Sequence, residues 1–145
     1  MTFAAPSVPV VVDASVAVEG YFATPRVVAM WRQWVSDGRT LLAPAIVWPE
    51  VANALVRRHR VPAAVVARHL ENLVSAGLET ADRGPRGVAF AAPLAERHGL
   101  SVYDATILWL AIDMDGELAT LDRALAATAV AEGVRLAEGL DPTGS

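Results

Sequence analysis

The sequence predicts an α/β fold in which helices cover both faces of a central parallel sheet of about five strands, a three-layer α/β/α arrangement. Short apolar runs with the length of buried strands alternate along the chain with longer segments of helical periodicity. Such alternation is typical of a parallel sheet whose strands are joined by helices. The length of 145 residues suits one domain. We expect a single domain over residues 1–145, with its core within about 10–136.

The first half of the chain alternates two strand segments with three helical ones. Pro25 opens the second helix, because proline is tolerated in a first helical turn, and Asp37-Gly38 ends it. Pro44 ends the second strand, and the helix after it carries Pro49 in its first turn. The expected elements are strand 9–12, helix 13–21, helix 25–36, strand 40–43 and helix 46–59.

The second half continues this alternation. Gly77 closes a helix, and the segment 82–87 has the glycine and proline content of a turn-rich connector. The tail from 138 to 145 is rich in glycine and proline, and we expect it to fray. The remaining expected elements are helix 62–76, strand 78–81, helix 88–99, helix 104–114, strand 117–120, helix 122–131 and strand 134–136.

The composition excludes several classes of protein. The chain has 12 basic and 16 acidic residues and a net charge of −4, unlike proteins that hold nucleic acid on a broad basic face. It has no cysteine, which excludes disulfides and thiolate sites. The longest apolar stretch, 105–112, is too short to span a bilayer, and the N-terminal segment lacks the basic region of a signal peptide. We expect a cytoplasmic protein that does not contact a membrane.

Four carboxylates stand at the edges of apolar runs, namely Asp13, Glu50, Asp104 and Asp122. In a parallel sheet the functional crevice lies outside the carboxyl ends of the strands, so acids that follow different strands meet at one edge. Uncompensated carboxylates at one place repel each other, and at least one pKa must rise unless a cation joins them. Oxygen ligands without cysteine and with few histidines favour Mg²⁺ or Mn²⁺ over zinc or copper.

A carboxylate cluster around one or two divalent ions is a common way to cut a phosphodiester bond, because the metal neutralises phosphate charge and generates hydroxide near neutral pH. The sequence offers no better nucleophile. The serines have no recognisable His-Asp partners, and His59, His69 and His98 are scattered on or near helix ends. We therefore expect metal-assisted cleavage rather than Ser-His-Asp hydrolysis.

Four motifs, in this order, resemble the PIN domain family, and in particular the VapC-type toxin ribonucleases of bacterial toxin–antitoxin modules. They are VVDAS at 11–15, PEVANAL at 49–55, YDAT at 103–106 and LATLD at 118–122. The resemblance covers about Val10 to Leu136, with 18 residues separating Asp104 from Asp122. It implies a three-layer α/β/α fold and Mg²⁺- or Mn²⁺-dependent endonucleolytic cleavage of RNA.

The resemblance also implies roles for single residues. Asp13 and Asp104 correspond to the principal metal ligands. Glu50 and Asp122 correspond to the remaining acids, which complete a second metal site, bind through water or orient the attacking water. Small polar groups are expected beside the acids at Ser15, Asn53 and Thr120.

The partners that the resemblance implies are an RNA substrate and a cognate protein antitoxin. The C-terminal segment of the antitoxin would wrap the toxin and block the acidic site with a basic side chain, and the toxin would form a homodimer. The one dense basic segment, with Arg57, Arg58 and Arg60, either contacts RNA phosphates or is a solvated helix end. Trp48, just before Pro49-Glu50, either packs in the core or stacks on a base.

Other interpretations stay open. Each acid taken singly could cap a helix or favour the dipole in a first turn. A receiver-like signalling domain would use Asp82 as phosphoacceptor after the third strand, but it normally also needs a late lysine, and all 12 basic residues are arginine. A PIN-like nuclease of RNA maturation, without an antitoxin, would share the same acidic site.

Overall fold

The computed structural model describes residues 7–138 and contains a parallel sheet of four strands. Their order in the sheet is β3-β2-β1-β4, so β1 lies in the interior of the sheet, with β2 on one side and β4 on the other. The α/β class with a central parallel sheet is thereby confirmed. The strands are β1 (Val10–Val12), β2 (Leu41–Ala43), β3 (Leu78–Thr80) and β4 (Glu117–Ala119).

The strand expected at 134–136 is reduced to a single bridge. Leu136 pairs with Leu118 of β4, and the bridge is closed by hydrogen bonds from Leu118 N–H to the Arg135 carbonyl and from Ala137 N–H to the Leu118 carbonyl, both 2.9 Å. One bridging pair does not extend into a ladder, so the sheet has four strands rather than about five. The frayed tail expected from 138 onward lies outside the described residues, apart from Glu138.

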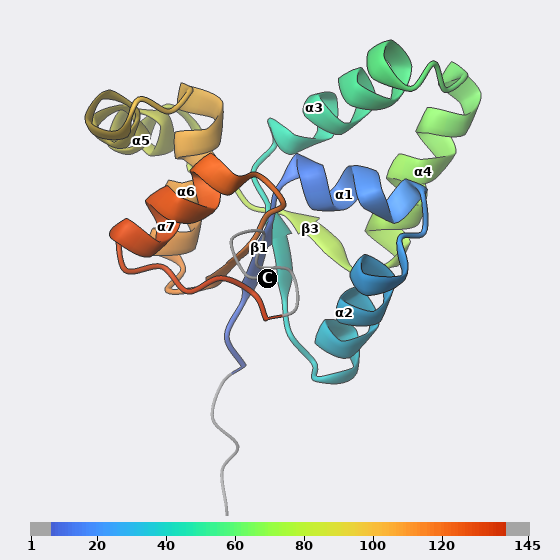
Figure 1. Cartoon of the computed structure of the whole chain (residues 1–145), viewed down its shortest axis with the longest axis horizontal. Coiled ribbons are helices and arrows are strands. Elements are labelled where there is room, and N and C mark those ends of the chain that lie inside the picture. The colour runs from blue at the N-terminus through green and yellow to red at the C-terminus, as the bar shows by residue number, and fades with distance from the viewer. Residues whose placement is uncertain (1–6, 139–145) are drawn as a thin grey trace, which may run out of the picture.

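The helices form the two outer layers of the sandwich (Figure 1). The chain moves from β1 through β2 to β3 in one direction and then crosses back to β4, and right-handed crossovers in opposite directions place their helices on opposite faces. One layer holds α1 (Ala14–Tyr21), α2 (Pro25–Ser36), α3 (Val47–Asn53) with its π-helical continuation η1 (Ala54–Arg58), and α4 (Ala63–Ser75). The other holds α5 (Gly84–His98), α6 (Val102–Asp113) and α7 (Arg123–Ala131).

Two local expectations are corrected. The connector expected at 82–87 is helical from Gly84, because Gly84 takes a positive φ of 58° at the start and Pro85 falls in the first turn, where its missing N–H costs nothing. The helix expected over 46–59 changes at Ala54 from α to π geometry. π-Helical turns are rare and are often found at functional sites.

The core lies between the sheet and both helical layers. All three residues of β1 are completely buried, which is the pattern of a central parallel strand. Helix α6 packs on β1 and β4 and is apolar nearly all round, while α5 covers its outer side. Trp31 and Trp34 of α2 are buried in the core. No helix within residues 7–138 is long and apolar enough to cross a membrane.

Candidate functional site

Asp13 lies at the centre of the candidate site, directly after β1 and at the N-cap of α1. Its side chain is only 4% exposed. The Oδ1 atom accepts hydrogen bonds from the Ser15 hydroxyl (2.6 Å) and the Val16 N–H (3.2 Å), and Oδ2 accepts one from the Thr120 hydroxyl. Two of the predicted polar neighbours, Ser15 and Thr120, therefore hold this carboxylate in place.

The loop after β4 is tied to the loop after β1 by the same side chains. The Leu121 N–H donates to Ser15 Oγ (2.9 Å), and the Asp122 N–H donates to Thr120 Oγ1 (3.0 Å). Asp122 itself is exposed and caps α7, because its Oδ1 accepts from the Leu125 N–H at 3.0 Å. From β1 the chain adds β2 and then β3 on one side, and it returns to add β4 on the other side of β1. The point between β1 and β4 where the strand order reverses is the position where α/β proteins most often bind ligands.

Glu50 and Asp104 reach the site from two further elements. Glu50 lies in the first turn of α3, after β2, and its Oε1 atom is buried without a hydrogen-bond partner among the described residues. Asp104 lies half-buried in the first turn of α6, where Ser101 supplies the cap by accepting from the Asp104 N–H at 3.1 Å. The capping role considered for Asp104 thus belongs to Ser101, and the Asp104 carboxylate is free of it.

The acids influence one another electrostatically. Burial raises the pKa of Asp13 from 3.8 to about 6, although its hydrogen bonds act in the opposite direction. Burial also raises the pKa of Glu50, and the charges of Asp104 and Asp13 add to that rise. The pKa of Asp104 is raised by burial and then by the charge of Asp122. These couplings place all four predicted acids in one electrostatic cluster, here called the acidic site.

Among residues 7–138, no basic side chain forms an ion pair with the acidic site. In the described part of the chain the ion pairs lie elsewhere, joining Arg39 to Glu117, Arg83 to Asp113, and Arg97 and His98 to Glu132. The pKa of Glu132 is accordingly lowered, first by its hydrogen bond with His98. Acids that are paired for structure and acids that are left unpaired are therefore found in different places.

The donor set of the acidic site suits a hard divalent cation. The orphaned Oε1 of Glu50 is an oxygen without a donor, and the charges of neighbouring acids add to the rise that burial causes in the pKa values of Asp13, Glu50 and Asp104. Within residues 7–138, no three His, Asp or Glu side chains converge closely enough to hold an ion by themselves. Mg²⁺ keeps several waters and often binds through only one or two carboxylates, so two of these acids would be enough to hold it.

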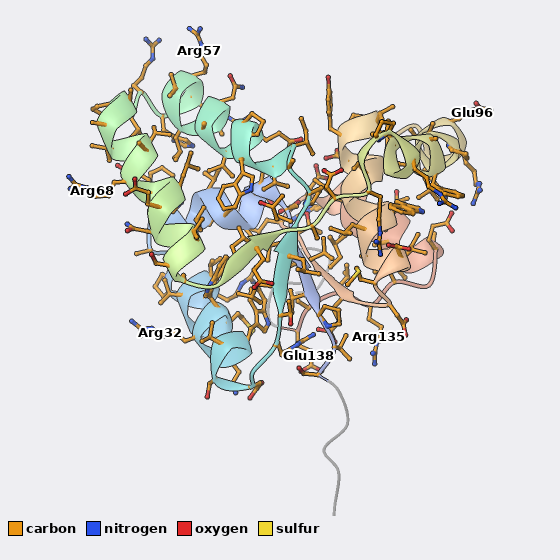
Figure 2. The ribbon with its side chains drawn as sticks, turned by 180° about the vertical axis from the view of Figure 1, so that it is seen from behind. Arg32, Arg57, Arg68, Glu96, Arg135 and Glu138 are labelled. Atoms are coloured by element: carbon orange, nitrogen blue, oxygen red, sulfur yellow. The ribbon has the colours of Figure 1, made fainter. Side chains whose placement is uncertain are left out.

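A groove of about 820 Å³ runs away from the acidic site between α1 and α3–η1 and is called the basic groove. Its polar lining consists of Ser15, Glu19, Glu50 and Asn53, together with Arg57, Arg58 and His59, after which it is named. Arg57 extends at the outer tip of this helical arm (Figure 2). Arg60, grouped with these cations in the sequence, does not line the groove.

A second hollow of about 360 Å³ overlaps the acidic site, because Glu50 and Asp104 are among its lining residues, and is called the Tyr103 hollow. Its lining shares Glu50 and Asn53 with the basic groove and adds Tyr103, Ile46 and Pro49. Sequence reasoning assigned no function to Tyr103, although the residue directly precedes Asp104 in a matched motif. Trp48, by contrast, is half-buried and donates its indole N–H to Thr80 Oγ1 at 2.8 Å, so the packing alternative applies to it.

Comparison with solved structures supports the fold. Protein PAE2754 from Pyrobaculum aerophilum is similar over 92% of this chain and 86% of its own, with 26% identity and a TM-score of 0.69. VapC20 from Mycobacterium tuberculosis, a toxin that cleaves the sarcin–ricin loop, is similar over 81% of this chain and 93% of its own, with 20% identity and a TM-score of 0.65. No curated protein sequence matches significantly. The PIN domain model matches residues 10–131, and the chain therefore belongs to the PIN domain family.

Proposed function

We propose that this protein is an endoribonuclease that cleaves RNA phosphodiester bonds with the help of Mg²⁺ or Mn²⁺ at the acidic site. PIN domains are generally nucleases, so the reaction class follows from the family. The observation that supports the finer proposal is the concentration of unpaired carboxylates, with elevated pKa values and one orphaned buried oxygen, at the carboxyl edge of the sheet.

Asp13 and Asp104 are the proposed metal ligands. Asp13 has an oxygen, Oδ2, that accepts only one hydrogen bond, and a carboxylate oxygen can accept a second interaction. A divalent cation held there would neutralise phosphate charge and lower the pKa of bound water. Glu50 and Asp122 would bind through water or orient the attacking water.

Ser15 and Thr120 have a positioning role in this proposal. Both hydroxyls donate to Asp13, which stabilises its charged form against the cost of burial. Ser15 also accepts the Leu121 N–H, so the loop that carries Asp122 is held next to the loop that carries Asp13. Asn53 lies one turn after Glu50, and its exposed amide borders both hollows.

Arg57 and Arg58 are the proposed contacts for RNA phosphates. They line the basic groove, which leads into the acidic site, and a local pair of guanidiniums can bind a backbone even though the net charge of the chain is −4. Both lie in the π-helical turn η1, and such turns are often found at functional sites. Arg60 is a weaker candidate because it lies outside the groove lining.

A toxin function, neutralised by a protein antitoxin, is the biological setting that we propose. The similarity to VapC20 and the resemblance of the four motifs support it. An antitoxin that places a basic side chain among the unpaired carboxylates would remove the repulsion between them and exclude a cation. We also propose a homodimer in the cytoplasm, as expected for toxins of this type.

The receiver-like alternative has little support from the geometry. Asp82, its phosphoacceptor, accepts hydrogen bonds from the Ala45 N–H (3.2 Å) and the Gly84 N–H (2.6 Å) and so acts as a turn residue before α5. The chain also has no lysine to complete such a site. A PIN nuclease of RNA maturation would use the same acids, and a small antitoxin-like reading frame next to the gene would favour the toxin over it.

The direct test is to incubate the purified protein with a mixed RNA pool in Mn²⁺ and to map the new RNA ends. We expect cleavage that EDTA abolishes and that Asp13→Asn lacks, while the circular dichroism spectrum of the variant stays unchanged. Metal-dependent cleavage retained by both Asp13→Asn and Asp104→Asn would refute the proposal.

A further inference from the structure

Tyr103 differs from the other aromatic residues of the described chain in having no partner. Tyr21, Phe22, Trp31, Trp34, Phe90 and Trp109 each lie against another ring, and Trp48 is hydrogen-bonded to Thr80. The Tyr103 side chain has neither a neighbouring ring nor a hydrogen bond among residues 7–138, and it is 59% exposed. Its ring therefore contributes little to the core and presents a face to solvent.

The unpartnered ring of Tyr103 lies beside the acidic site. It lies in the first turn of α6, one residue before Asp104, and lines the Tyr103 hollow beside the acidic site. Ile46 and Pro49 supply apolar wall to the hollow, and Asn53 and Ser101 supply neutral polar groups. Glu50 and Asp104 of the acidic site line it as well, so a base bound here would lie directly beside the acids. An aromatic face, an apolar wall and a few groups able to hydrogen-bond are what a nucleobase requires.

We propose that the Tyr103 hollow binds the base of a nucleotide next to the scissile phosphate, with the Tyr103 ring stacking on that base. This inference rests on the proposed ribonuclease function and specifies how its substrate is held. The Asn53 amide, which can both donate and accept, is placed to hydrogen-bond the edge of the same base. The hollow would then recognise one nucleotide by stacking and by a base edge.

The basic groove and the Tyr103 hollow differ in chemistry, and this difference would determine which part of a bound RNA strand lies in each. The basic groove offers guanidiniums and suits the sugar–phosphate backbone, whereas the Tyr103 hollow offers a ring and no cation. Glu50 and Asn53 line both and mark the boundary. Single-stranded RNA crossing this boundary would be held by phosphates on one side and by a base on the other, with the phosphodiester at the acids between them.

The test measures the binding of a short single-stranded RNA, containing a mapped cleavage site, by fluorescence anisotropy in EDTA, where no cleavage occurs. Base stacking on an aromatic side chain is worth enough that Tyr103→Ala should bind roughly 5- to 150-fold more weakly. Tyr103→Phe keeps the ring and should bind within about 2-fold of the unaltered protein. Val102→Ala is the matched control, because Val102 is an exposed neighbour in the same turn that does not line the hollow.

Abasic RNAs separate stacking from an indirect effect on Asp104. The base is removed at one position at a time on each side of the cleaved bond, and each RNA is titrated against the unaltered protein and Tyr103→Ala. We expect one position at which the missing base weakens binding to the unaltered protein and abolishes the difference between the two proteins. A Tyr103→Ala protein that binds as tightly as the unaltered one would overturn the proposal. The proposal would also be overturned if removal of the base weakened binding to the unaltered protein equally at every position.

Failure of this inference is distinguishable from failure of the proposed function. An unaltered protein that cuts RNA in Mn²⁺ while Tyr103→Ala leaves both binding and cleavage unchanged retains the nuclease and loses the base site. If Tyr103→Ala impairs binding of a protein antitoxin but not of any RNA, the hollow is a protein contact and the base-binding proposal is wrong.

Discussion

Glu117 at one end of the parallel sheet is paired with a cation, whereas the clustered acids at the other end are not. At the amino end of β4, Glu117 is paired with Arg39 at 2.8 Å, and the Arg39 Nε also donates to the Val8 carbonyl at 2.7 Å. At the carboxyl end, the charges of Asp13, Glu50 and Asp104 influence one another, and in the described chain none of these acids forms an ion pair. The same sheet thus has a neutralised end, which serves stability, and an uncompensated end, which costs stability and is available for function.

This contrast argues against a purely structural role for the acids. Partly buried carboxylates are normally paired or hydrogen-bonded, because burial without compensation is costly. The chain follows that rule at Glu117 and departs from it at Glu50, whose Oε1 is buried without a donor among the described residues. Departures of this kind are concentrated at functional sites.

The largest effect is expected when equivalent neutral substitutions are made at the two ends. Glu50→Gln and Asp104→Asn should each lower Mn²⁺-dependent RNA cleavage by roughly 100-fold or more, because they remove carboxylates that are proposed to hold the metal or orient the attacking water. Glu117→Gln should leave the cleavage rate unchanged. Initial rates on one mapped RNA give the comparison, and an equal loss in Glu117→Gln would show that the acidic site is not special.

The pH dependence of stability provides the second test. Because folding raises the pKa of Asp13 from 3.8 to about 6, the folded state favours its protonated form. Stability from this group is fully present below about pH 4 and is lost as the pH rises to about 6, by up to about 3 kcal/mol. The raised pKa values of Glu50 and Asp104 act in the same direction.

Urea denaturation in EDTA at pH values from 4 to 8 measures this loss. Asp13→Asn should flatten the dependence, whereas Glu117→Gln should keep it. Adding Mn²⁺ at pH 7.5 should restore stability, since a cation binds the ionised carboxylates of the folded state. A dependence as steep in Asp13→Asn as in the unaltered protein would contradict the assignment of the shift to Asp13.

A moderate effect is expected at the neutralised end. Glu117→Gln leaves the half-buried Arg39 without its charged partner, and we expect a loss of about 1–3 kcal/mol in the free energy of unfolding. Urea denaturation at one pH is sufficient. The pair would prove dispensable if the variant were as stable as the unaltered protein.

The smallest effect concerns the basic groove. Arg57→Ala should weaken RNA binding at low salt and flatten the slope of log affinity against log salt by roughly 0.7, as expected for one lost phosphate contact to a single strand. Arg60→Ala is the matched control and should change the slope less, because Arg60 does not line the groove. Equal slopes for the two variants would show that the basic groove is not the surface that contacts RNA phosphates.

The sequence predicted the sheet and the position of the acids because both depend on local patterns. The boundaries of α2 were read directly from Pro25 and from the Asp37-Gly38 turn, and β1 from a run of valines that ends in Asp13. Since parallel strands present their carboxyl ends at one edge, the alternation of strands and helices was enough to bring distant acids together.

The features that sequence reasoning missed depend on packing between distant segments. The π-helical turn at 54–58 has no reliable local signal, and the helical start at Gly84 was obscured because glycine and proline usually indicate a turn. The third strand of the second half was reduced to a bridge at Leu136. The free ring of Tyr103 could be recognised only from the structure, which shows the ring contacts or hydrogen bonds of the other aromatic residues of the described chain.

The most direct test of the central claim is Mn²⁺ binding, followed by electron paramagnetic resonance at pH 7.5. We expect saturable binding by the unaltered protein and by Glu117→Gln, and binding weakened by roughly tenfold or more in Asp13→Asn and in Asp104→Asn, since each of these acids is a proposed ligand. Undiminished Mn²⁺ affinity in both aspartate variants would show that the carboxyl edge of the sheet is not the metal site.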